Sequence, residues 1–80
     1  MTDLTPLNQF AHHGMLASYH YADDSAKEWG MAVEEVSKAM LLYRAHPELR
    51  DAMRTTAENF LWALDFKRKA EAIDAEQEAT

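Results

Sequence analysis

The chain has 80 residues, with fourteen acidic against eight basic side chains and a formal net charge of −6. We expect one domain, residues 1–80, and the absence of cysteine excludes disulfides and favours a cytoplasmic location. The acidity disfavours direct nucleic-acid binding, which depends on neutralising phosphates, and no stretch approaches the roughly 18 apolar residues of a membrane span.

The first expected helix covers residues 6–21 and begins at Thr5-Pro6, where threonine caps the helix and proline occupies its first position. Small residues recur along this helix at three- and four-residue steps: Ala11, Gly14, Ser18 and Ala22. Glycine inside a helix costs roughly 1 kcal/mol relative to alanine and is usually kept for close approach. We therefore expect helix packing through Ala11, Gly14 and Ser18. The large residues that would meet them are Trp29, Met40 or Phe60.

Three histidines of this helix, His12, His13 and His20, invite a metal or ligand hypothesis. His13 and His20 lie seven positions apart, which is about 10 Å along a helix and too far for both to bind one ion. We expect these side chains to face outward. The alternative is a ligand or metal site that His12, His13 and His20 form across subunits.

The second expected helix covers residues 26–45. It begins at the capping box Ser25-Ala26-Lys27-Glu28 and ends before Pro47. Apolar residues follow one another along it at steps of three and four, a heptad-like spacing that favours long helices packed nearly antiparallel. They are Ala22, Ala26, Trp29, Val33, Val36, Met40 and Tyr43.

Ser25 also permits a different interpretation. An acidic, all-helical chain of this size with Asp24-Ser25 at a helix start resembles an acyl carrier protein, in which the serine after aspartate carries phosphopantetheine. The resemblance implies Ser25 as the modified residue. Ala26 departs from the family, which has leucine there, and the capping box accounts for Ser25 without modification.

The third expected helix covers residues 47–75, with a frayed tail over residues 76–80. Its short connection predicts an antiparallel hairpin with the helix over residues 26–45. One face carries Leu49, Met53, Phe60, Leu61 and Leu64. The sequence thus predicts an all-α three-helix bundle in which the short N-terminal helix packs on this long hairpin.

A second apolar stripe lies on nearly the opposite side of that third helix: Trp62, Phe66, Ala70 and Ile73. One straight helix cannot turn both faces toward the same hairpin partner. Exposed aromatic rows often mark interfaces, so we expect a homodimer formed through this stripe.

No catalytic or phosphate-binding motif is present, so we expect no enzyme and no cofactor. The leading hypothesis is a small, non-enzymatic, acidic protein-interaction module with an unidentified protein partner, without membrane or direct nucleic-acid binding. Small acidic helical chains of this kind occur among phage and mobile-element accessory proteins, including inhibitors of host proteins. The histidine site and the carrier modified at Ser25 stay as alternatives.

Overall fold

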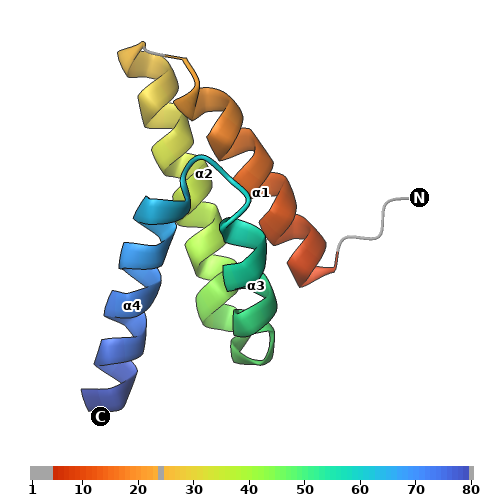
Figure 1. The fold of residues 1–80 in the computed structure, drawn as a ribbon, viewed down its shortest axis with the longest axis vertical. Helices are drawn as coiled ribbons and strands as arrows, with labels where there is room; N and C mark the ends of the chain where they lie inside the picture. Colours follow the sequence, from red (N-terminus) through yellow and green to blue (C-terminus); the bar gives the residue numbers. More distant parts are fainter. Residues whose placement is uncertain (1–4, 24, 80) are drawn as a thin grey trace.

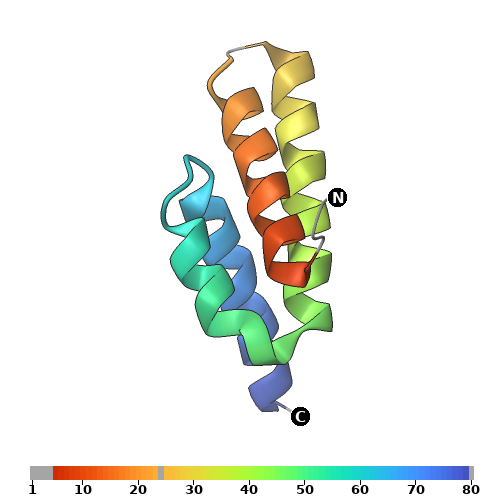
Figure 2. The ribbon, with the colours of Figure 1, turned by 90° about the vertical axis from the view of Figure 1, so that its right-hand side faces the viewer.

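The computed structural model describes residues 5–23 and 25–79, and this part of the chain is all-helical. The elements are α1 (Pro6–Tyr21), α2 (Ala26–Ala45), a short 3-10 helix η1 (Pro47–Leu49), α3 (Arg50–Ala57) and α4 (Ala63–Ala79). The helices alternate in direction, so that α1 and α2 form one hairpin and α3 and α4 another (Figure 1). Figure 2 shows that the α1–α2 hairpin extends well beyond the α3–α4 turn.

The first two helices begin where their capping residues predict. The Thr5 hydroxyl accepts a hydrogen bond from the backbone N–H of Asn8 at 3.2 Å, and Pro6 stands at the first helical position. The Ser25 hydroxyl accepts from the N–H of Glu28 at 3.1 Å. Each cap satisfies a backbone donor that has no partner inside its helix. The expected ranges 6–21 and 26–45 are the ranges of α1 and α2.

The single helix expected over residues 47–75 is wrong. The chain forms a turn over residues 58–62, between the end of α3 and the start of α4, and reverses direction. Turn hydrogen bonds replace the helical ladder here, including Phe60 N–H to the Ala57 carbonyl at 3.0 Å and Ala63 N–H to the Phe60 carbonyl at 3.2 Å. The reversal lets Trp62, Phe66 and Ala70 of the second apolar stripe face the same core as Met53 of the first, which a straight helix could not do.

The core lies between the two hairpins and takes residues from all four α-helices. Its buried members are Phe10, Ala17, Val36, Ala39, Met40, Tyr43, Met53, Ala57, Trp62, Phe66 and Ala70. Phe66 is central, because its ring meets those of Phe10, Tyr43 and Trp62 edge-on at centroid distances of 5.1, 5.4 and 5.0 Å. Such edge-to-face pairs add to the free energy gained by burying the rings.

The end of α4 differs from the expected fraying. The helix continues to Ala79 instead of ending near residue 75. Asp74 forms ion pairs with Arg50, at 3.1 Å, and with Arg54, and Arg50 also donates to the Gln77 side chain at 2.7 Å. These contacts with α3 hold the last turns of α4, which the acidic sequence alone does not favour.

Candidate functional site

A groove of about 360 Å³ runs between α3 and α4 and is the best candidate for a binding site among the described residues. Apolar side chains line its interior: Ala57, Ala63, Leu64, Phe66 and Ala70. Charged side chains share the lining: Arg54 on α3, Glu58 in the turn that follows, and Lys67 and Glu71 on α4. A mainly apolar surface with a few charged groups around it is the usual composition of a protein-binding surface.

Leu64 of this groove's lining is exposed to solvent, and so is Leu61 in the turn that precedes α4. Leu61 is 72% exposed and Leu64 is 79% exposed, although both were expected on the core face of a continuous helix. The turn over residues 58–62 changes the helical phase, so the core takes Trp62 and Phe66 in their place. Leu64 therefore enlarges the apolar surface that the groove presents to solvent.

The turn is held against α1 by two hydrogen bonds. The backbone N–H of Leu61 donates to the Ser18 hydroxyl at 3.0 Å, and the Trp62 indole N–H donates to the Gly14 carbonyl at 2.7 Å. Gly14 is buried, whereas Ala11 and Ser18 are partly exposed at its side. A Cβ atom at Gly14 would lie 2.6 Å from the Phe60 ring, so this glycine makes the close approach that its position indicates. These contacts fix the position of the α3–α4 turn relative to α1.

The expected dimer stripe is not available for a contact between chains. Trp62, Phe66 and Ala70 are 2%, 1% and 1% exposed, and Ile73 is partly buried against the same core. A single chain covers all four, since the reversal at residues 58–62 turns them inward. The expectation that they form a homodimer interface is therefore wrong.

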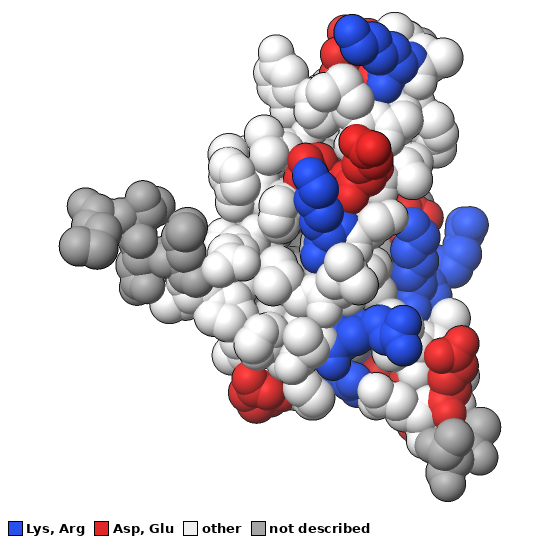
Figure 3. Space-filling view, turned by 180° about the vertical axis from the view of Figure 1, so that it is seen from behind, with Lys and Arg blue, Asp and Glu red and all other residues white. Residues whose placement is uncertain are grey.

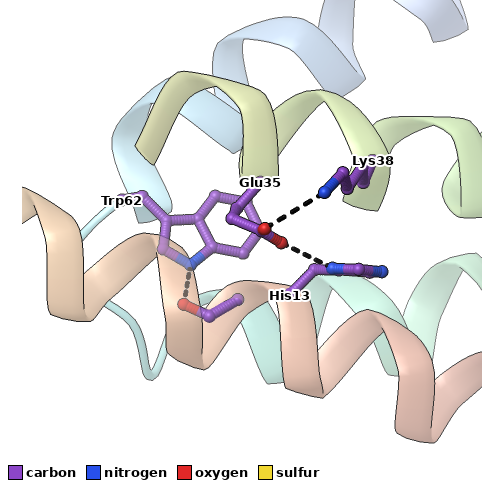
Figure 4. Close-up of polar contacts among 5 residues, drawn as sticks. His13, Glu35, Lys38 and Trp62 are labelled. Atoms are coloured by element: carbon purple, nitrogen blue, oxygen red, sulfur yellow. Dashed lines mark hydrogen bonds and ion pairs between the residues drawn. The ribbon is translucent and has the colours of Figure 1, made fainter. Parts of the chain in front are cut away.

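His13 faces α2 and does not point into solvent as expected. Its Nδ1 lies 2.6 Å from a carboxylate oxygen of Glu35, and Lys38 donates to the other oxygen at 3.3 Å (Figure 4). Burial of Glu35 raises its pKa, but the hydrogen bonds and charges of His13 and Lys38 outweigh burial and hold the pKa below its ordinary value. The cluster thus ties α1 to α2 through an ionised carboxylate.

The other two histidines do not join His13. His20 also faces α2, where its Nδ1 contacts the Glu28 carboxylate, while His12 is exposed. Within residues 5–23 and 25–79, no group of three histidine, cysteine or acidic side chains is placed to hold a metal ion. The structure therefore separates His12, His13 and His20, and two of them have carboxylate partners instead of ligand positions. Sequence reasoning missed Glu28 and Glu35, whose spacing of seven matches that of the two histidines.

The chain was compared with protein-family models, with characterised proteins and with solved structures, and none of them matches it. Across the part of the chain that the structure describes, no helix has the length and apolarity that crossing a bilayer would require.

Proposed function

We propose that this chain is a non-enzymatic protein-interaction module that binds an amphipathic helix of a protein partner in the α3–α4 groove. The observation that carries the proposal is the exposure of Leu64, at 79%, in the lining of an apolar groove of about 360 Å³. Helix-in-groove recognition uses such a surface, with apolar anchors spaced three and four residues apart on the bound helix.

The position of the leucines favours a macromolecular partner over a small molecule. A small-molecule site encloses most of its ligand, whereas Leu64 of the groove's lining and Leu61 of the turn are 79% and 72% exposed to solvent. Burying them against a partner removes apolar area from water at roughly 25 cal/mol per Å². A protein segment can cover both leucines and the groove together.

The charges of the lining suggest which helices would fit. They are Arg54 on α3, Glu58 in the turn that follows, and Lys67 and Glu71 on α4, and Arg54 already pairs with Asp74. A bound helix with both signs of charge beside its apolar stripe can pair with Glu58, Lys67 and Glu71. Charge pairs at the rim of an interface contribute more to selectivity and association rate than to affinity.

Photo-crosslinking in cells of the organism that encodes the chain tests this function. A photoreactive phenylalanine analogue at position 64 should crosslink a protein through an amphipathic helical segment, and the same analogue at position 41 is the matched control. Leu41 is 67% exposed but lies on α2, outside the groove.

The crosslinked segment is then synthesised and titrated against the purified chain. We expect Leu64→Glu to weaken its binding about tenfold or more and Leu41→Glu to leave it unchanged. Two outcomes would contradict the proposal. One is an equal yield of crosslinked protein at positions 41 and 64, and the other is a segment that binds the Leu64→Glu variant as tightly as the wild type. Capture of a small molecule in the groove would contradict it too.

A further inference from the structure

Gly30 lies on the outer face of α2 with open space around it. A Cβ atom built at this glycine meets nothing within 4 Å, in contrast to Gly14, and the neighbouring Trp29 is 57% exposed. A glycine inside an exposed helix lowers the stability of that helix by roughly 1 kcal/mol relative to alanine. Nothing among the described residues of this chain approaches closely enough to account for it.

The charges around Gly30 are arranged in a self-complementary way. Lys27 precedes Gly30 by three positions, and Glu34 follows Met31 by three. Seen down the axis of α2, with 100° of rotation per residue, Lys27 lies about 60° and Glu34 about 40° from Gly30, both on the same side. They are exposed and about 10 Å apart along α2, too far to pair within one chain. On the side of the molecule that Figure 3 shows, basic and acidic side chains are interspersed.

From these features we infer that two copies of this chain associate through α2, antiparallel, about a twofold axis between Gly30 and Met31. This symmetry places Lys27 level with the partner's Glu34 and Glu34 level with the partner's Lys27, on the same side of the contact. Two equivalent ion pairs result, as an isologous interface requires. Gly30 lies at the centre, where the missing side chain lets the two helix backbones approach.

The opposite side of the same contact is apolar. Ala26 and Val33 lie about 40° and 60° to that side of Gly30, and Trp29 lies beyond them. In the antiparallel register, Trp29 comes beside the partner's Val33. These residues continue the apolar seam whose lower half, Val36, Met40 and Tyr43, is buried in the core. The upper half lies on the part of the hairpin that extends beyond the α3–α4 turn (Figure 2).

Charge reversal tests the register directly, with sedimentation equilibrium as the measurement. Lys27→Glu alone and Glu34→Lys alone each replace two attractive pairs by two repulsive ones, and each should weaken self-association about tenfold or more. The double variant restores both pairs and should recover the wild-type dissociation constant. An equimolar mixture of the two single variants should form the heterodimer in preference to either homodimer.

Two further variants separate this surface from the groove. Gly30→Lys places a long side chain at the centre without any contact inside the chain, so the helical signal should persist while the dimer is lost. Leu64→Glu, in the α3–α4 groove, should leave self-association unchanged, so a failure of one proposal does not affect the other. A monomer mass for the wild type up to millimolar concentration would overturn the dimer. A dimer that ignores both charge reversals would overturn it as well.

Discussion

The Trp62 indole N–H donates a 2.7 Å hydrogen bond to the backbone carbonyl of Gly14, joining the start of α4 to the middle of α1. The Phe60 ring stacks on Trp62 at a centroid distance of 5.9 Å, and both rings lie where a side chain at Gly14 would project. A buried indole needs an acceptor, and only a residue without a side chain lets the ring reach this carbonyl. One contact thus explains both the glycine in α1 and the position of the α3–α4 turn.

Gly14→Ala should destabilise the chain by about 2 kcal/mol, because the added Cβ would lie 2.6–2.8 Å from the Phe60 and Trp62 rings. Gly30→Ala is the matched control and should stabilise by roughly 0.5–1 kcal/mol, since alanine favours a helix and meets nothing there. Urea denaturation at a dilute, monomeric concentration measures both. Equal effects of the two substitutions would mean that α1 does not meet these rings closely.

Phe66→Ala should cost about 3–5 kcal/mol, since this ring is 1% exposed and contacts three other aromatic rings. Leu64→Ala, two positions away in the same helix, should change stability by less than about 0.5 kcal/mol because Leu64 is 79% exposed. Thermal unfolding of both variants checks the phase of α4. A larger loss at Leu64 than at Phe66 would restore the continuous helix over residues 47–75.

Ser25→Ala should cost about 1 kcal/mol through loss of the hydroxyl that accepts from the Glu28 N–H. Ser37→Ala, at an exposed position inside α2, is the control and should have little effect or a slightly favourable one. The mass of the intact protein, expressed beside a phosphopantetheinyl transferase, completes the experiment. An unmodified mass supports a purely capping role for Ser25, and an added phosphopantetheine group would support the carrier alternative.

The sequence predicts the fold well where local chemistry decides it. Thr5-Pro6 and Ser25 mark the starts of α1 and α2, and Pro47 follows the end of α2. The turn over residues 58–62 has no such mark, since it contains neither proline nor glycine. The turn forms because it allows Trp62 and Phe66 to be buried beside Phe10. This contact joins distant parts of the chain, and the helix propensities of single residues do not predict it.

The same limit applies to the candidate site. The two apolar stripes of the C-terminal half are evident from the sequence, and the conflict between them is real. A chain can resolve it by pairing with a second copy or by turning back on itself, and residue spacing does not distinguish these outcomes. The turn buries Trp62 and exposes Leu61 and, in the lining of the groove, Leu64. The surface proposed for binding is therefore exposed by the reversal at residues 58–62, which tertiary contacts determine.

The ionised Glu35 carboxylate should make the free energy of unfolding depend on pH. Burial alone would raise its pKa, but His13 and Lys38 lower the folded value below that of an unfolded glutamate. The stabilisation by the ionised Glu35 carboxylate is thus fully present above the pKa of an unfolded glutamate, roughly 4.3. It is lost as the pH falls through the lower pKa that Glu35 has in the folded chain. The stability difference between wild type and Glu35→Gln should shrink over that window in urea titrations. At a dilute, monomeric concentration Glu34→Gln, on the exposed side of α2, is the control, and an equal response there would contradict the role of His13.

Asp74 should determine whether the last turns of α4 stay attached to α3. Its carboxylate pairs with both Arg50 and Arg54, and these arginines lie over the Tyr43 ring at 5.2 and 5.9 Å. Asp74→Asn removes the charge and should cost about 1 kcal/mol, because the two pairs are partly exposed and each contributes modestly. Amide hydrogen exchange should show the loss as faster exchange confined to the C-terminal turns of α4, with the rings around Phe66 still protected.

Glu76→Gln is the matched control for Asp74→Asn, since Glu76 is an exposed acid of the same helical turn and has no ion pair among those found between described residues. Removing this charge relieves repulsion at the negative end of the helix dipole, so exchange in α4 should slow slightly or stay the same. High salt should reduce the difference between wild type and Asp74→Asn, because screening weakens partly exposed pairs. If both substitutions accelerate exchange equally, the ion pairs of Asp74 do not hold the end of α4.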